Sequence, residues 1–300
     1  MIEYIEAKSI LQKSKNGSGW FGIDYTINMY RGCNYGCIYC DSRSEIYNIT
    51  NFDKVKVKKD ALIILEKELK SKRNKGIVSL GAMSDSYNKL EESLLLSQNT
   101  IKLLTKYGFG LNLETKSSLI LRDIDLIAKM NETNDVIIKV TITTANDQKA
   151  KLIEPNVSSS SERFEIIKQL SAKNIYCGIL MMPLIPGFND TFENIKEIVE
   201  KAAASNAKFI YPAFAVTIRK GQVEYFDQQL KIIDPRLHQE LGLLNKRQYV
   251  IPSKQAKQLY KYFEKLCIEY NIKYKMKDII KEYIKPKNEQ LSFNFTENYF

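Results

Sequence analysis

The stretch Tyr30-Arg-Gly-Cys-Asn-Tyr-Gly-Cys-Ile-Tyr-Cys-Asp41 holds three of the five cysteines of this 300-residue chain. They have the spacing C-x3-C-x2-C and are Cys33, Cys37 and Cys40. Three thiolates this close in sequence can each bind one corner of a small iron–sulfur cluster. Because no fourth cysteine lies nearby, the fourth iron would have no protein ligand, whereas a closed electron-transfer cluster has four. The stretch therefore predicts a cluster with one open iron, in a loop that Gly32 and Gly36 allow to turn tightly.

Two other uses of these cysteines stay open. A structural zinc site requires four ligands, and the only histidine, His238, lies in a distant segment. Zinc therefore remains an alternative only if Cys177 or Cys267 completes the site. The second alternative is a trio of buried cysteines with a structural role alone.

The composition is that of a packed globular protein. Apolar residues make up 44% of the chain, which excludes a disordered protein. No apolar run approaches the roughly 20 residues of a membrane span, and the first residues lack the basic and apolar regions of a signal peptide. We therefore expect a cytoplasmic protein with no membrane partner, in which clustered cysteines bind metal and do not form disulfides.

The net charge of +10 at pH 7 has two explanations. A basic surface attracts nucleic acid. A lysine-rich composition with widely spread lysines gives the same net charge without any binding function. Composition does not place the charge on one face, so a nucleic-acid partner and a purely compositional origin both stay open.

Predicted strands alternate with predicted helices through most of the chain. The strands are expected at 23–29, 76–82, 109–115, 135–144, 175–182 and 208–216, and the helices at 59–70, 91–104, 122–130, 161–172 and 191–204. The helix at 161–172 follows a serine run and has Glu162 in its first turn, which is typical of a capped N-terminus. Such alternation indicates a parallel sheet covered by helices. Six units are too few for a full eight-stranded barrel, so we predict an α/β fold with a partial (β/α)6 TIM-type barrel.

The pattern changes after residue 216, where helices are expected at 222–232 and 254–270 with little strand between them. We divide the chain into an N-terminal segment (1–22), the partial barrel (23–216) and a C-terminal helical extension (217–300) that covers the barrel. The extension ends in a tail that we expect to be mobile.

The cysteine motif, with Tyr39 directly before its last cysteine, resembles the signature of the radical SAM superfamily. The resemblance implies that the three cysteines ligate a [4Fe–4S] cluster and that S-adenosylmethionine chelates the open iron through its amino and carboxylate groups. Tyr39 would then back the adenine. It also implies reductive cleavage of the cofactor to methionine and a 5′-deoxyadenosyl radical, which abstracts a hydrogen atom from the substrate. Such an enzyme implies a reducing partner protein such as flavodoxin or ferredoxin.

Further segments in the same order, at 30–33, 39–43, 84–87, 115–117, 121–125 and 183–190, resemble the spore photoproduct lyase-like group of that superfamily. The resemblance covers about residues 24–240. Spore photoproduct lyase reverses a methylene-linked thymine dimer in DNA by radical chemistry. In such lyases a cysteine precedes the Ser-Asp pair and returns a hydrogen atom to the product. Here that residue is Met83, which has no S–H, so we do not predict a true spore photoproduct lyase.

By position, the resemblance assigns Ser84 and Asp85 to the amino group of the cofactor and Lys116 to its carboxylate. A cation is physically sensible there, because a carboxylate beside an anionic cluster needs compensation. Thr141 and Thr143 on the fourth strand would add hydroxyl contacts. The alternative for each is a polar strand-end residue facing solvent, although C-terminal strand ends of a barrel favour function.

Two residues are candidates for the hydrogen-atom source. Tyr87 follows the Ser-Asp pair closely, and Cys177 lies within the fifth strand. The alternatives are a tyrosine packed beside Asp85 and a small core cysteine.

The end of the chain offers one partner motif. Its sequence resembles the short peptides with which bacterial DNA-maintenance proteins dock on the sliding clamp, with Gln290, Leu291, Phe293 and Phe295 as the contact residues. The alternative is an edge strand that packs its alternating apolar residues on the protein itself.

The sequence thus predicts a lyase-like radical SAM enzyme that acts on a DNA or RNA lesion or a modified base. One alternative keeps the radical chemistry but takes a peptide or small molecule. Another is a non-catalytic iron–sulfur protein that binds nucleic acid. A salt-dependent affinity for DNA would favour the first of these.

Overall fold

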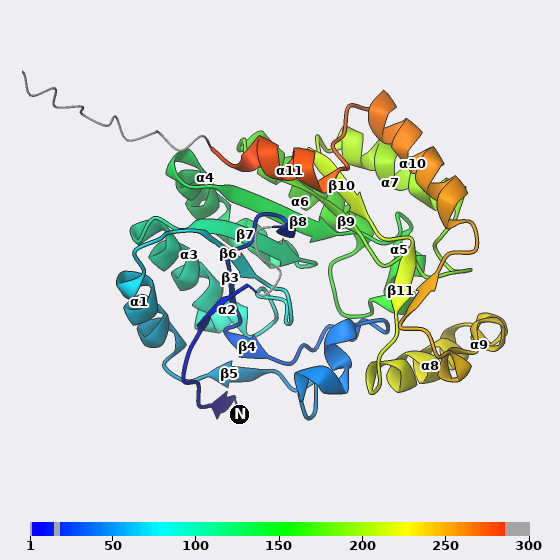
Figure 1. The fold of residues 1–300 in the computed structure, drawn as a ribbon, viewed down its shortest axis with the longest axis horizontal. Helices are drawn as coiled ribbons and strands as arrows, with labels where there is room; N and C mark the ends of the chain where they lie inside the picture. The colour runs from blue at the N-terminus through cyan, green and yellow to red at the C-terminus, as the bar shows by residue number, and fades with distance from the viewer. Residues whose placement is uncertain (1, 15–18, 286–300) are drawn as a thin grey trace, which may run out of the picture.

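A seven-stranded sheet forms the centre of the computed structural model, which describes residues 2–14 and 19–285 (Figure 1). Its strand order is β10-β9-β8-β7-β6-β3-β2. The bounds are β2 Leu11–Lys13, β3 Tyr25–Ile27, β6 Ile77–Leu80, β7 Gly110–Thr115, β8 Val136–Thr141, β9 Cys177–Met181 and β10 Phe209–Pro212. Within this sheet, β3, β6, β7, β8, β9 and β10 pair in parallel, and β2 pairs antiparallel with β3 at one edge. The sheet is open, so the predicted α/β fold with a partial barrel of parallel strands is confirmed.

Helices connect the parallel strands and cover the outer face of the sheet (Figure 1). They are α1 Ala61–Ser71, α3 Leu96–Lys106, α4 Ile124–Thr133, α6 Ser160–Ala172 and α7 Phe192–Ala204. Each helix packs an apolar stripe on the sheet, and one fully buried residue from each is Leu65, Leu104, Ile127, Ile167 and Ile198. Helix α6 begins with the predicted serine cap, because Ser159 and Glu162 exchange hydrogen bonds in a capping box.

Several short elements escaped prediction because so few residues show no periodicity. A small sheet joins β1 Glu3–Ile5, β5 Lys56–Lys58 and β4 Tyr30–Arg31. The other unpredicted elements include β2, α5 Asp147–Ile153, α9 Pro235–Leu241, α11 Met276–Tyr283 and the 3-10 helices Asp41–Arg43, Glu45–Tyr47, Ser118–Asp123 and Leu243–Asn245. The helix expected at 91–104 is instead two helices, α2 Glu91–Leu94 and α3, because Leu95 between them has a positive φ of 53°.

The strand expected at 208–216 is also divided. After β10 the chain forms β11 Ala215–Thr217, which pairs antiparallel with β12 Val250–Pro252 in the region where little strand was expected. The helices expected at 222–232 and 254–270 are confirmed as α8 Gln222–Ile233 and α10 Ala256–Glu269. Within the described ranges, no helix has the length and hydropathy needed to cross a membrane.

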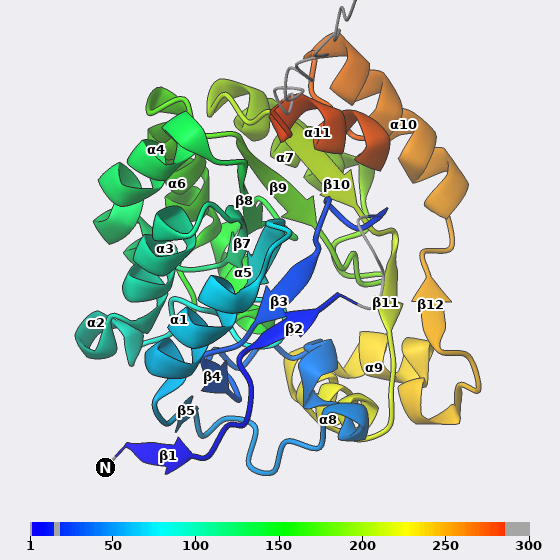
Figure 2. The ribbon, with the colours of Figure 1, turned by 60° about the vertical axis from the view of Figure 1, so that its left-hand side comes forward.

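The segment just before β3 meets the last described helix, α11, at the N-terminal ends of the parallel strands. Tyr283 on α11 donates its hydroxyl to the carbonyl oxygen of Phe21 at 2.6 Å, and Asn112 on β7 donates to the same oxygen at 3.0 Å. Figure 2 shows α11 lying across that end of the sheet beside α10. The predicted boundaries after residues 22 and 216 stay predictions, but both outer segments contribute to the barrel core. The predicted clamp peptide at 290–295 lies outside the described residues.

Candidate active site

The cysteine loop leaves β4 and turns back at two glycines. Gly32 has a φ of +85° and Gly36 a φ of +71°, a region that side chains with a Cβ avoid. A Cβ at Gly32 would lie 2.5 Å from the carbonyl oxygen of Phe52. The predicted role of the two glycines is therefore confirmed, and the loop follows a path that other residues would strain.

Neighbouring elements hold the loop by hydrogen bonds to its backbone and to Tyr35. The four contacts are Ser84 Oγ to Gly32 O (2.7 Å), Tyr35 Oη to Tyr87 O (2.6 Å), Ile38 N to Ile153 O (3.0 Å) and Gln222 Nε2 to Tyr39 O (3.2 Å). The apolar side of the loop packs on α8 and α9. The C-terminal extension thus covers the loop from outside, as Figure 2 shows for α8 beside the segment that follows the cysteines.

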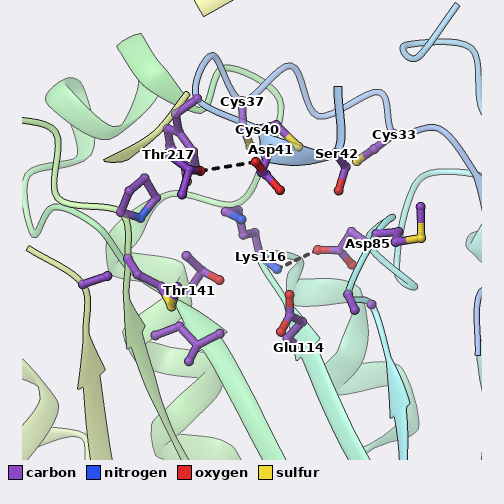
Figure 3. Close-up of a pocket in the computed structure, with 18 of the residues that line it drawn as sticks. Cys33, Cys37, Cys40, Asp41, Ser42, Asp85, Glu114, Lys116, Thr141 and Thr217 are labelled. Atoms are coloured by element: carbon purple, nitrogen blue, oxygen red, sulfur yellow. Dashed lines mark hydrogen bonds between the residues drawn. The ribbon is translucent and has the colours of Figure 1, made fainter. Parts of the chain in front are cut away.

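All three cysteines line one cavity of about 550 Å³, a volume typical of ligand sites. The opposite wall comes from the C-terminal ends of the parallel strands, with Gly81, Met83, Thr115, Lys116, Thr141, Met182 and Ala213. Figure 3 shows the cysteines along one side and Asp85, Lys116, Glu114 and Thr141 on the other. The cavity therefore lies where barrel enzymes of this class place their chemistry.

The thiols suit a cationic ligand. Burial raises the pKa of Cys33 to about 11 and also raises the pKa of Cys37 and Cys40, so each thiol needs a positive partner to become a thiolate at neutral pH. Within residues 2–14 and 19–285, no three His, Cys, Asp or Glu side chains are close enough to hold a single metal ion. A [4Fe–4S] cluster offers each thiolate a separate iron atom, so the loop fits a cluster bound through Cys33, Cys37 and Cys40.

Asp85 and Lys116 form the polar part of the opposite wall. Asp85 accepts hydrogen bonds from Thr115 Oγ1 at 2.8 Å, Lys116 N at 2.8 Å and Tyr87 N at 2.9 Å. Burial raises the pKa of Asp85 although these bonds favour the carboxylate. Burial also lowers the pKa of Lys116, but its neighbours Cys37, Glu154 and Asp85 outweigh that effect and hold the pKa above its ordinary value. Lys116 is therefore a cation facing the cavity.

A buried charge chain fixes Tyr39. Its hydroxyl donates to Glu154, and Arg163 Nη2 lies 2.5 Å from the other oxygen of that carboxylate. Arg163 Nη1 also donates to the carbonyl oxygen of Thr141 at 2.8 Å. The Nζ of Lys116 lies 5.9 Å from the centroid of the Tyr39 ring. The Tyr39 ring is thus held between the loop and the strand ends.

Four of the predicted cofactor residues lie in the cavity wall, namely Tyr39, Asp85, Lys116 and Thr141. Ser84 does not line the cavity, because its hydroxyl is bonded to Gly32. Thr143 is fully buried, and its hydroxyl has no hydrogen-bond partner within the described residues. Thr141, the last residue of β8, lines the cavity, whereas Thr143 lies beyond the end of the strand and does not.

The two candidate hydrogen-atom sources, Tyr87 and Cys177, do not line the cavity. Tyr87 is 1% exposed and donates its hydroxyl to Asp123 Oδ2 at 3.0 Å. Cys177 is fully buried, and its Sγ contacts the carbonyl oxygen of Ile167 on α6 at 3.5 Å, on the outer side of the sheet. Burial raises the pKa of Cys177 to about 12. The position of Cys177 therefore agrees with the alternative given for it above, a small core residue.

Five residues in or beside the cavity were not predicted from the sequence, namely Trp20, Glu114, Lys139, Glu154 and Arg163. A signal existed for two of them, since Glu114 and Lys139 are charged residues inside predicted strands of a sheet covered by helices. Charged side chains are rarely buried without a partner, so each should have suggested a paired or functional position. Trp20 and Glu154 lie in irregular segments, and Arg163 lies in a helix in which a charged residue is ordinary.

Comparison with known proteins agrees with this geometry. The family described as the Radical SAM superfamily matches residues 27–202. The uncharacterized protein MJ0683 of Methanocaldococcus jannaschii is 32% identical over 191 residues, which cover 63% of this chain and 70% of that protein. The uncharacterized protein Rv2578c of Mycobacterium tuberculosis is 26% identical over 272 residues, which cover 88% and 79%.

Solved structures show the same fold. Spore photoproduct lyase complexed with dinucleoside spore photoproduct superposes with a TM-score of 0.62 at 14% identity, over 89% of this chain and 79% of that chain. A mutant of that lyase with bound AdoMet and the dinucleoside has a TM-score of 0.57 at 13% identity, over 83% and 74%. The chain therefore belongs to the radical SAM superfamily, whose members use a [4Fe–4S] cluster and S-adenosylmethionine.

Proposed function

We propose that this radical SAM enzyme acts on DNA or RNA, at a lesion or a modified base. Membership of the superfamily supports an enzyme, and the substrate is our inference. When bound, the cluster and S-adenosylmethionine supply the reductive cleavage that yields a 5′-deoxyadenosyl radical. A flavodoxin or ferredoxin is the proposed electron donor.

The residues of this chain would bind and orient the cofactors. Cys33, Cys37 and Cys40 would hold the cluster. Lys116, a cation in the opposite wall, would pair with the carboxylate of S-adenosylmethionine, and Asp85 would accept from its amino group. Tyr39, clamped through Glu154, would back the adenine. Because α8 and α9 cover the loop, water would be kept from this side of the cavity.

The observation that carries the nucleic-acid assignment is a basic groove beside the cavity. The groove has a volume of about 340 Å³, and the four cations that line it are Arg219, Lys220, Lys246 and Arg247. It adjoins the cavity through the β11–β12 ribbon, because Thr217 and Val250 of that ribbon line the cavity. Glu224 is the one acid among its lining residues in the described chain.

The groove also offers an aromatic surface. The guanidinium of Arg219 lies 4.5 Å from the centroid of Tyr249, which is exposed. Arg219 is paired with Asp41 at 3.0 Å and Lys220 with Glu45 at 2.9 Å, whereas Lys246 and Arg247 are exposed. Cations that bind phosphates, next to an aromatic ring that stacks on bases, are typical of single-stranded nucleic-acid sites. The similarity in fold to a lyase that binds a dinucleoside supports the same class of substrate.

Anaerobic reconstitution tests the proposal in two steps. The first is electron paramagnetic resonance of the dithionite-reduced protein, in which a [4Fe–4S]+ signal should shift when S-adenosylmethionine is added. The second is the yield of 5′-deoxyadenosine with single-stranded DNA, duplex DNA, RNA or no nucleic acid. We expect at least one nucleic acid to raise that yield. An equal yield in all four would favour a peptide or small molecule instead, and an unshifted signal would contradict the radical mechanism.

A further inference from the structure

An ion pair lies inside the barrel, directly below the cofactor residues. Glu114 on β7 and Lys139 on β8 are paired residues of neighbouring strands. Lys139 Nζ lies 3.1 Å from Glu114 Oε2, and the lysine side chain is fully buried. Burying a lysine is costly, and replacing such a pair by apolar residues often stabilises a protein. The pair is therefore a candidate for function more than for stability.

Glu114 is open to the cavity on one side. Its side chain is 27% exposed and lines the cavity, whereas Lys139 does not. Among the described residues, Lys139 is the one hydrogen-bond partner of this carboxylate. Figure 3 shows Glu114 pointing into the cavity below Lys116. One oxygen is thus held by the lysine, and the carboxylate keeps acceptor capacity toward whatever enters.

Depth separates Glu114 from the cofactor residues. Alternate residues of a strand share a face, so Glu114 and Lys116 point the same way, with Glu114 one layer deeper in the barrel. Figure 3 shows Lys116 and Asp85 nearer the cysteines than Glu114 is, and Tyr39 belongs to the cysteine loop itself. Glu114 therefore faces the part of the cavity beyond the cofactor.

An aromatic surface lies next to the ion pair. The centroid of the Phe21 ring is 4.7 Å from Lys139 Nζ. The rings of Trp20 and Phe21 pack edge to face, with their centroids 5.0 Å apart. Trp20 also meets Tyr211 edge to face at 5.3 Å. Trp20 lines the cavity and is partly exposed. The cavity floor thus presents one carboxylate acceptor and one indole held by two other rings.

We infer that Glu114 and Trp20 form the recognition subsite for the substrate base. This inference rests on the nucleic-acid function proposed above. Trp20 stacks on the flat ring, and Glu114 accepts a hydrogen bond from an N–H on the edge of that ring. Lys139 is a positioning residue, since its ion pair orients the carboxylate. The subsite selects heteroaromatic rings with an N–H donor and rejects rings in which that nitrogen is methylated.

The test uses the holoenzyme with saturating S-adenosylmethionine and no reductant, so that the cofactor site is filled and no turnover occurs. The probes are fluorescein-labelled single-stranded pentanucleotides whose central base is normal or carries a methyl group in place of its donor hydrogen. Fluorescence anisotropy gives the Kd of each probe. We expect methylation to raise the Kd roughly tenfold or more for at least one base. Glu114→Gln should bring that ratio close to one, because its single amide oxygen would stay with Lys139 and its NH2 group would face the base.

Two variants complete the design. Glu132→Gln, an exposed residue on α4, is the matched control and should keep the wild-type ratio. Trp20→Ala should weaken all probes alike, by about five- to a hundredfold, and it keeps the inference testable if Glu114→Gln fails to fold. A methylation ratio that Glu114→Gln leaves unchanged would overturn the inference, as would wild-type affinity in Trp20→Ala.

Other outcomes separate this inference from the proposed function. Wild-type enzyme that binds no probe would refute both. Wild-type enzyme that binds every probe but shows no methylation effect would refute the recognition subsite alone. A Glu114→Gln holoenzyme that loses the S-adenosylmethionine-dependent shift of its paramagnetic signal would assign Glu114 to the cofactor and also overturn the inference.

Discussion

Replacing Lys246 and Arg247 by glutamine removes two exposed cations from the basic groove. Unlike Arg219 and Lys220, which are paired with acids, these two form no salt bridge within the described part of the chain. Their charges are therefore free to meet phosphates without breaking an internal contact. The substitution should leave folding and cofactor binding unchanged and act on nucleic-acid affinity alone.

The expected magnitude follows from counterion release. Each phosphate contact contributes about 0.9 to the slope of log affinity against log salt for duplex DNA and about 0.7 for a single strand. Loss of two contacts should therefore reduce the slope by about 1.8 or about 1.4. Between about 50 and 200 mM salt, the affinity of the wild-type protein should fall about tenfold more than that of the double variant.

The assay is fluorescence anisotropy of a labelled single strand and a labelled duplex at several salt concentrations. The control is Lys67→Gln with Lys129→Gln, which removes the same charge from exposed positions on α1 and α4. The control should keep the wild-type slope. An unchanged slope in the groove variant would refute the reasoning, because general attraction to a basic protein would then account for binding. A slope reduced equally in both double variants would refute it as well.

Three further predictions concern the site and its support. Lys116→Met should raise the Kd for S-adenosylmethionine about tenfold to a hundredfold, because a charge-assisted hydrogen bond contributes about 1.5–3 kcal/mol. Titration of the paramagnetic shift with S-adenosylmethionine measures this Kd. An unchanged Kd would show that Lys116 does not bind the cofactor. Gly32→Ala should lower the free energy of unfolding by about 1–3 kcal/mol, because its Cβ would lie 2.5 Å from a backbone oxygen. Gly108→Ala, with a similar φ of +72° and nothing within 4 Å, is the control for urea denaturation, and equal losses would show that the contact is unimportant. Burial raises the pKa of Asp123, but Arg122 and its other partners hold it below the ordinary value of 3.8. The Asp123 carboxylate therefore binds its proton more tightly in the unfolded chain than in the folded protein. Its contribution to the free energy of unfolding is present above about pH 3.8 and is lost as the pH falls below the lowered pKa. Asp123→Asn should flatten the acid side of a stability–pH curve, and a curve parallel to that of the wild type would contradict the assignment.

Much of the barrel could be predicted because its signals are local. Strands β6, β8 and β9 are mostly apolar, which is the pattern of a sheet buried on both faces. The helices show their caps and apolar stripes in the sequence. The break at Leu95 could not be predicted, because the residues around it all favour a helix and only packing imposes the left-handed turn.

The site could be predicted in part for a similar reason. The cysteines are adjacent in sequence, so their spacing alone indicated their chemistry. Ser84 and Cys177 show the limit of that reasoning, since a residue can lie near a strand end and still point away from the cavity. Trp20 reaches the cavity only because the N-terminal segment folds into the barrel. Such long-range placement leaves no periodic trace in the sequence.

The junction between Tyr283 and Phe21 also bears on biosynthesis. It joins residues that are 262 positions apart, so the residues of α11 must leave the ribosome before this contact can form. N-terminal parts of a chain begin to fold during synthesis, and here the parallel strands would wait with their inner apolar face exposed to water. A truncated product that lacks α11 should therefore aggregate although it contains every cysteine of the loop. Helix α11 thus joins the barrel late, since its contact with Phe21 can form only after residues 21–283 have been synthesised.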